Sequence, residues 1–387
     1  MDFLYLKSNR QHKTAAASFR PFTASNNAQL QRFLESTVLN TNQPLLHSHI
    51  TQLYHLKRVP GVRFIATQIT TFFRSSNSFN RYLNMSGYSM FTHGEALEFL
   101  TNQLGVADVQ DRLSWDRRTL LDEITTNLQI RLPFTNLGLM SIERDERRRP
   151  TLGEIKRDVL SGKGGLCYHL NVANFYILKA LGFNVLLASA AIPVWKTHII
   201  VYVHNVEKTG DTFLAEAGVG YPTFRAICLD HDDTPTFRDS FLEYKYIKRD
   251  GKLLRLHRQG DQGGGRSLKS VCIDGWWVVY TADLKGTSNI EEFYPKFDQM
   301  YIYHLQAQDP LITQFHAVFR LVQFPEKRAV IISNQKLILE KDNGLLETEV
   351  LEDGDDAILR AVRRYFPAIP EDMATRALAN WRRTLQA

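Results

Sequence analysis

The hydrophobic pattern of this chain changes period at Gly182, and that change constrains its fold most strongly. Before Gly182, apolar residues recur three and four positions apart, which predicts helices over Thr119–Ile130, Leu152–Leu160 and 167–181. After Gly182, segments alternate or are continuously apolar, which predicts strands, the first of them over Val185–Ile192. The pattern therefore predicts an α+β protein in which helices precede an antiparallel sheet or small barrel.

Four segments are expected along the 387 residues. A basic extension covers 1–84, a helical bundle 85–183, an antiparallel β domain 184–289 and a C-terminal α/β domain 290–387. The last domain is expected to contain three strands and two helices, over 317–323, 328–333, 336–340, 357–365 and 370–385.

The positive charge of the chain is concentrated in 1–84. The whole chain has a formal net charge of +6, but residues 1–84 hold ten basic and two acidic side chains, which leaves −2 for the rest. A nearly neutral body argues against nucleic acid as a partner. Three interpretations of 1–84 remain open: a disordered extension, a transit segment that would direct the protein to mitochondria, or a stretch upstream of the working protein.

Several classes of protein are disfavoured by the sequence. The three cysteines, Cys167, Cys228 and Cys272, lie too far apart for a metal motif, and their number suits a reducing, cytoplasmic compartment without disulfides. No apolar run approaches ~18 residues, so no membrane span is expected. The glycine run at 263–265 lacks the strand and helix context of a phosphate-binding loop. No metal is expected.

Cys167 follows two glycines and begins a helical pattern. A side chain in the first turn of a helix lies near unpaired backbone N–H groups, which favour an anion such as a thiolate. Gly164 and Gly165 allow a sharp turn and leave space for a substrate. The alternative is that Cys167 is a small buried apolar residue at a helix start.

His198 and Glu216 lie on two predicted strands that a short loop over 207–211 makes antiparallel neighbours. A separation of 18 positions permits the two side chains to meet on one face, although the sequence does not set the register. A carboxylate in an apolar strand needs a partner, and an imidazole is a suitable one. The alternatives are a core histidine for His198 and an exposed edge position for Glu216.

Four segments, in order, resemble the arylamine N-acetyltransferase family. The resemblance runs from about Met90 to Leu385. The segments are Pro133-Phe134-Thr135-Asn136-Leu137, Gly164-Gly165-Leu166-Cys167-Tyr168-His169-Leu170-Asn171, Thr197-His198-Ile199-Ile200 and Leu214-Ala215-Glu216-Ala217-Gly218-Val219-Gly220. The resemblance implies an N-terminal helical bundle, a central antiparallel β-barrel-like domain and a C-terminal α/β lid domain, with a cysteine-protease-like core.

The resemblance also implies a reaction. Cys167, His198 and Glu216 would form a catalytic triad that moves an acetyl group from acetyl-CoA to an arylamine, arylhydroxylamine or hydrazine through an acetyl–cysteine. The acyl donor would contact the backbone of Gly218, Val219 and Gly220. Phe134, Tyr221 and Phe224 would form an apolar wall for the aromatic amine. The protein is expected to be a monomer.

The chain departs from the family pattern at Thr135, Lys163, His169 and Glu216, where Glu, Arg, Glu and Asp are usual. His169 therefore introduces a second imidazole that could compete with His198 for the cysteine. Two other functions remain open: a thiol hydrolase or transglutaminase-like enzyme, which shares the order cysteine, histidine, carboxylate, and a non-catalytic homologue that binds CoA.

Overall fold

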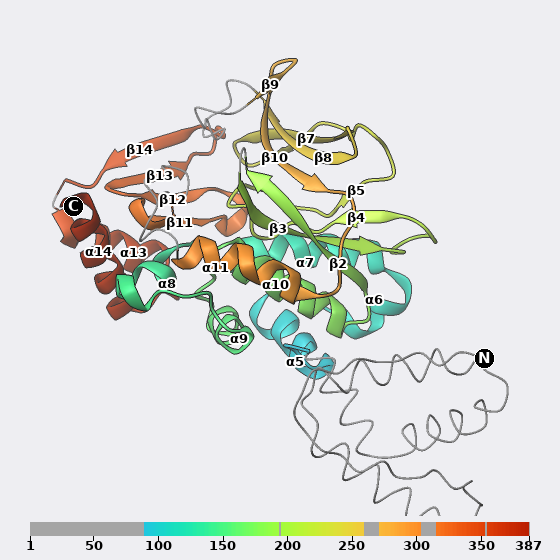
Figure 1. Cartoon of the computed structure of the whole chain (residues 1–387), viewed down its shortest axis with the longest axis horizontal. Coiled ribbons are helices and arrows are strands. Elements are labelled where there is room, and N and C mark those ends of the chain that lie inside the picture. Colours follow the sequence, from blue (N-terminus) through green and yellow to red (C-terminus); the bar gives the residue numbers. More distant parts are fainter. Residues whose placement is uncertain (1–88, 193–194, 259–270, 303–314, 353, 387) are drawn as a thin grey trace, which may run out of the picture. The chain divides into compact units, whose positions relative to one another are not determined.

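A computed structural model describes residues 89–192, 195–258, 271–302, 315–352 and 354–386, and the extension expected over 1–84 lies outside them. Ser89–Ala387 forms one compact unit (Figure 1). Within the described ranges, no helix combines the length and hydrophobicity needed to span a bilayer. The same ranges contain no group of three or more His, Cys, Asp or Glu side chains arranged to hold a metal ion.

Most of the helices precede the large sheet in sequence, and the others follow it. Helix α9 has the predicted bounds, and a capping box between Thr151 and Glu154 begins it. The α-helices are α5 (His93–Glu98), α6 (Val109–Trp115), α7 (Arg117–Arg131), α8 (Leu137–Met140), α9 (Leu152–Leu160), α10 (Cys167–Ala180), α11 (Tyr294–Ile302), α13 (Gly354–Tyr365) and α14 (Glu371–Gln386).

A nine-stranded antiparallel sheet is the larger of the two sheets in the described unit. Its order is β5-β4-β3-β2-β10-β8-β7-β6, and β9 pairs with β10. Its strands are β2 (Asn184–Ile192), β3 (Trp195–His204), β4 (Thr212–Leu214), β5 (Ile227–Cys228), β6 (Phe237–Asp239), β7 (Leu242–Arg249), β8 (Lys252–Arg258), β9 (Cys272–Ile273) and β10 (Trp276–Asp283).

A second antiparallel sheet has the order β1-β11-β12-β13-β14. Its strands are β1 (Phe134–Thr135), β11 (Arg320–Gln323), β12 (Val330–Ser333), β13 (Lys336–Glu340) and β14 (Leu346–Val350). Because β1 comes from the predicted helical bundle and pairs with β11, this sheet joins two of the predicted domains. Figure 1 shows α13 and α14 next to this sheet.

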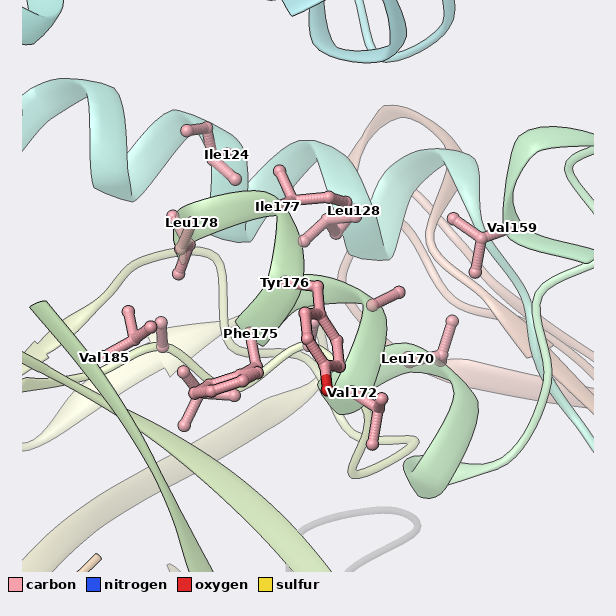
Figure 2. Packing of buried hydrophobic residues seen from close by; sticks show 14 of the residues in the cluster. Ile124, Leu128, Val159, Leu170, Val172, Phe175, Tyr176, Ile177, Leu178 and Val185 are labelled. Atoms are coloured by element: carbon pink, nitrogen blue, oxygen red, sulfur yellow. The ribbon is translucent and has the colours of Figure 1, made fainter. Parts of the chain in front are cut away.

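Helix α10 is the buried centre of the largest hydrophobic core. Its residues Cys167–Leu178 are all buried, so its apolar surface is not confined to one stripe. Figure 2 shows Ile124 and Leu128 of α7 near Ile177 of α10, and the helix also contacts β2 and β3. Packing on all sides holds this helix, and therefore its first residue, in a fixed position.

Candidate active site

The predicted turn before Cys167 is present, and α10 begins at that residue. Gly164 has φ +67°, and a Cβ added to it would lie 1.9 Å from the carbonyl oxygen of Pro133. Only glycine fits there. The turn is tied to β1, because the Thr135 N–H donates to the Gly165 carbonyl at 3.0 Å, and the Gly165 N–H donates to the Pro133 carbonyl just before β1 at 3.1 Å. The N-cap, Leu166, makes no side-chain cap, so the first-turn N–H groups stay available for other acceptors.

The imidazole of His198 lies between Cys167 and Glu216. Its Nε2 is 3.2 Å from Glu216 Oε2, and the ring also hydrogen-bonds the Cys167 side chain. Because Nε2 faces the carboxylate, Nδ1 is the ring nitrogen left for the sulfur. The relative exposures of the three residues are 3, 1 and 0 %. Cys167, His198 and Glu216, which we call the triad, therefore form a row shielded from water.

The β3–β4 hairpin brings His198 and Glu216 together. The predicted antiparallel pairing is confirmed: Tyr202 of β3 lies opposite Leu214 of β4. The strand predicted to contain Glu216 ends at Leu214, so that part of the prediction is wrong and Glu216 lies just beyond the strand. Beyond the end of β4, the Ala215 N–H still donates to the Val201 carbonyl of β3 at 2.9 Å. This bond keeps the chain alongside β3 as far as Glu216.

Three polar side chains hold Glu216, and none of them is predicted from the sequence to be functional. Asn171 Nδ2 donates to Glu216 Oε1 at 2.8 Å, and the Tyr280 hydroxyl donates to Oε2 at 3.1 Å. Gln129 Nε2 donates to the backbone carbonyl of Glu216 at 2.7 Å. The sequence carried one signal for a role of Asn171 in the site: it lies one turn after Cys167 and therefore on the same side of α10.

Charge and burial act in opposite directions on the triad. Burial alone lowers the pKa of His198, but the Glu216 carboxylate and the hydrogen bond with Cys167 outweigh it and raise that pKa to about 10. Burial alone raises the pKa of Glu216, but the charge of His198 outweighs it and lowers that pKa below its ordinary value. Both groups are therefore charged at neutral pH, and the ring can pair with a thiolate.

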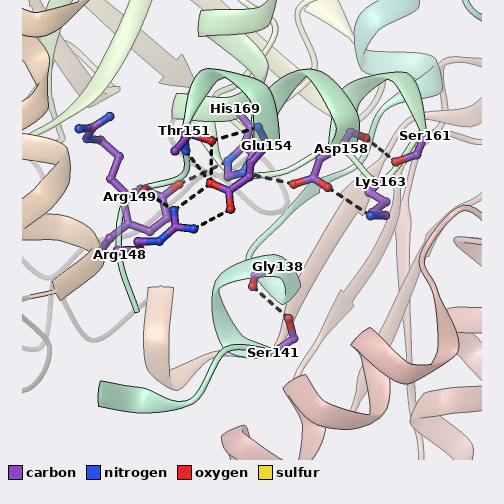
Figure 3. A network of polar contacts seen from close by, with 11 residues as sticks. Gly138, Ser141, Arg148, Arg149, Thr151, Glu154, Asp158, Ser161, Lys163 and His169 are labelled. Carbon is purple, nitrogen blue, oxygen red and sulfur yellow. Dashed lines mark hydrogen bonds and ion pairs between the residues drawn. The ribbon is translucent and has the colours of Figure 1, made fainter. Parts of the chain in front are cut away.

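His169, the second imidazole of the cysteine motif, has other partners. Its Nδ1 is 3.3 Å from the Tyr301 hydroxyl, and its Nε2 is 3.9 Å from Asp158 Oδ2. Asp158 is also paired with Lys163 at 3.2 Å (Figure 3). Burial lowers the pKa of His169 to about 4, so this ring is neutral at pH 7. The imidazole charged at neutral pH is therefore His198.

Gly218 lies directly against the nucleophile candidate. A Cβ added to Gly218 would be 3.1 Å from the Cα of Cys167 and 3.0 Å from Asn171 Nδ2, which is closer than ordinary side-chain packing allows. The Gly218 N–H is 3.3 Å from Glu216 Oε1. The first of the three residues expected to contact an acyl donor therefore has bare backbone beside Cys167.

The other residues predicted for the donor and substrate sites lie along the same segment. Val219, Phe134 and Tyr221 are half-buried, and the Phe134 ring lies against Gly220. Phe224 is buried and belongs to the second core cluster. Phe134 and Tyr221 thus offer accessible aromatic surface next to Gly220, whereas Phe224 contributes to the packing behind it.

The chain matches a known protein family and is similar to solved structures. A family model described as N-acetyltransferase matches residues 119–367, more than half of the chain. The structure of arylamine N-acetyltransferase from Mycobacterium marinum is similar with a TM-score of 0.56 at 15 % identity, over 73 % of this chain and 98 % of that one. No curated protein matches the sequence significantly.

Two further solved structures show the same likeness. The M. marinum enzyme in complex with CoA has a TM-score of 0.54 at 15 % identity, over 73 % of this chain and 98 % of that one. The Salmonella typhimurium enzyme has a TM-score of 0.53 at 18 % identity, with the same two coverages. The predicted α+β fold with a cysteine-protease-like core is confirmed, and the antiparallel sheet expected to be barrel-like is curled into a half-barrel.

Proposed function

The chain belongs to the arylamine N-acetyltransferase family, a family of acyltransferases, and from this premise we propose that it transfers an acetyl group from acetyl-CoA to an arylamine, arylhydroxylamine or hydrazine. The observation that carries the proposal is the triad, in which His198 contacts both Cys167 and Glu216. A charged imidazole beside a thiolate is the arrangement that nucleophilic cysteine catalysis requires.

The first half-reaction forms an acetyl–enzyme. The Cys167 thiolate attacks the thioester carbonyl of acetyl-CoA, and a carbon–sulfur bond to the enzyme forms. The bond to the CoA sulfur then breaks, and the imidazolium of His198 gives its proton to the leaving thiolate. The first-turn N–H groups of α10 are the donors available to the oxyanion of the tetrahedral intermediate.

The second half-reaction regenerates the thiolate. Acetylation removes the charge and the hydrogen bond through which Cys167 raises the pKa of His198, so the ring stays neutral more easily in the acetyl–enzyme. The amine nitrogen attacks the acetyl carbonyl, and neutral His198 accepts a proton from it. Cys167 leaves as a thiolate, and the amide product departs. Glu216 remains ionised throughout and orients the ring.

The segment Gly218-Val219-Gly220 is our candidate for contact with CoA. Its support is the close approach of Gly218 to Cys167, because a bulky residue there would separate the donor from the nucleophile. Phe134 and Tyr221 are candidates for contact with the aromatic ring of the acceptor, since each is half-buried near Gly220.

Steady-state rates with acetyl-CoA and either an arylamine or a hydrazine test the proposal. A covalent intermediate predicts parallel double-reciprocal lines, the signature of ping-pong kinetics. Cys167→Ala should abolish transfer, and Cys272→Ala, at an exposed cysteine, should not change it. Acyl transfer from amides but not from acetyl-CoA would contradict the proposal in favour of a thiol hydrolase. CoA binding without transfer would contradict it in favour of a non-catalytic homologue.

A further inference from the structure

Arg255 is a charged side chain enclosed within the nine-stranded sheet. It lies on β8 and is 0 % exposed. Its guanidinium donates to His257 Nε2 at 2.9 Å, the Tyr246 hydroxyl at 2.9 Å, Thr223 Oγ1 at 2.7 Å and the Pro222 carbonyl at 3.1 Å. These four acceptors, all in the described part of the chain, are uncharged. A buried guanidinium bonded to neutral groups is costly unless a compensating charge lies nearby.

Two tyrosines connect Arg255 to the carboxylate of Glu216. Arg255 lies opposite Tyr246 of β7 on one side and opposite Tyr280 of β10 on the other. The register of β10 shifts between Val278 and Tyr280, and this bulge places Tyr280 in the row. The two tyrosine hydroxyls are hydrogen-bonded to each other, and Tyr280 donates to Glu216 Oε2 at 3.1 Å.

Arg255, Tyr246, Tyr280 and Glu216 can form a continuous chain of polarised hydrogen bonds. The guanidinium donates to Tyr246, so the Tyr246 hydroxyl is free to donate to Tyr280, which donates to Glu216. Each bond in such a chain strengthens the next, and the positive end of the chain is directed at the carboxylate. The charge of Arg255 therefore acts on Glu216 through Tyr280, which donates to the same Oε2 that His198 contacts.

The charge balance around Glu216 changes during the proposed reaction. When His198 is an imidazolium, its charge balances the carboxylate. When His198 has lost its proton, Glu216 would be a buried anion without a balancing charge, which favours its protonation. We propose that Arg255 is a positioning residue that keeps Glu216 ionised in the half of the cycle in which His198 is neutral. The inference rests on the proposed function, because it assumes that His198 alternates between these states.

The other titratable groups around the pair do not supply a cation. The Cys167 side chain of α10 is a thiol or a thiolate and never carries a positive charge. Burial and then Arg255 lower the pKa of His257 well below its ordinary value, so that ring is neutral. Burial raises the pKa of each of three tyrosines, on β3, β7 and β10: Tyr202, Tyr246 and Tyr280. Within the described residues, the cation that opposes Glu216 besides His198 is therefore Arg255.

The test is the titration of His198 in the full-length protein. Labelled histidine ring carbons are followed by NMR against pH, and His198→Asn assigns the resonance. In Arg255→Met, the proton on His198 becomes the remaining charge that balances Glu216, so the titration midpoint should shift to higher pH. Arg255→Lys keeps the charge and should leave the midpoint near that of the wild type.

A matched control separates this effect from a general loss of charge. Arg258 lies on the same strand, is partly exposed and pairs with Glu243 at 2.7 Å, so Arg258→Met should leave the midpoint unchanged. An Arg255→Met midpoint equal to that of the wild type contradicts the inference, even if the enzyme is active. A raised midpoint in a protein that transfers no acetyl group supports the inference and contradicts the proposed function.

If Arg255→Met does not fold, a double variant tests whether Arg255 balances the charge of Glu216. Glu216→Gln together with Arg255→Met removes both charges, so folding should be recovered if the two balance each other. No recovery would contradict the inference, because it would show that Arg255 has a structural role independent of Glu216. Circular dichroism and the thermal unfolding midpoint measure the recovery.

Discussion

Two buried histidines of this protein have opposite protonation states at neutral pH because their neighbours differ. His198 faces the Glu216 carboxylate and the Cys167 side chain, which outweigh burial and raise its pKa to about 10. His169 faces a tyrosine hydroxyl, with a carboxylate no closer than 3.9 Å, and burial lowers its pKa to about 4. Since both rings are buried, the adjacent negative charge decides which one is an imidazolium.

Substitution of Glu216 separates charge from size at the triad. Glu216→Gln keeps the length of the side chain but removes the anion that holds and charges His198, so acetyl transfer should fall by about 100-fold or more. Glu216→Asp keeps the anion and should be affected less, although the shorter side chain cannot reach every present partner. Single-turnover rates at pH 7 measure both, and a Gln variant as fast as the wild type would remove the carboxylate from the mechanism.

At the scale of elements, the features predicted from sequence are the local ones. The start of α10 at Cys167 and the β3–β4 hairpin depend on turn residues and periodicity, and both are confirmed. The register that places Tyr280 beside Glu216 depends on a bulge in β10, for which the sequence carries no local signal. Strand β14 is not predicted, because four of its five residues are exposed and two of them are glutamates, so no buried apolar face marks it.

The first turn of α10 should contribute to acid sensitivity. The pKa of His169 is lowered from 6.5 to about 4 in the folded protein, so the unfolded chain binds the extra proton first as pH falls. Its contribution to stability is present above pH 6.5 and is lost between pH 6.5 and 4, by up to about 3 kcal/mol. His169→Gln should therefore flatten the fall in unfolding free energy over that range.

Urea unfolding at several pH values between 4 and 7 measures this difference. His93 provides a matched control, because it is exposed and its pKa is raised by hydrogen bonds with Gln110 and the Ala180 carbonyl. His93→Gln should not flatten the acid side of the profile. Parallel profiles for His169→Gln and the wild type would show that His169 takes up its proton equally in the folded and the unfolded state, which would contradict a lowered pKa.

At the scale of the whole molecule, the triad draws on parts of the chain that lie far apart in sequence. Cys167 begins a helix buried in the main core, whereas His198 lies on β3 of the large sheet and Glu216 lies just after β4. The chemical types and order of these three residues could be read from the sequence. Arg255 could not be assigned a role, although a charge inside an apolar strand was a visible signal, because its connection to Glu216 crosses three strands.

Removal of 1–84 tests whether the unit Ser89–Ala387 is sufficient for folding and for acetyl transfer. Every contact described for the triad involves residues of Ser89–Ala387. A chain that starts at Met85 should therefore keep the unfolding midpoint and the acetyl-transfer rate, while its net charge changes from +6 to −2. Loss of activity at an unchanged midpoint would show that 1–84 contributes to the site.

The mass of the intact protein after incubation with acetyl-CoA alone shows whether Cys167 carries the acetyl group between the two half-reactions. In the absence of an acceptor amine, we expect a gain of one acetyl group, located by peptide mapping on Cys167 and removed when an arylamine is added. An active protein that shows no acetyl group on Cys167, or carries it on another residue, would contradict the account.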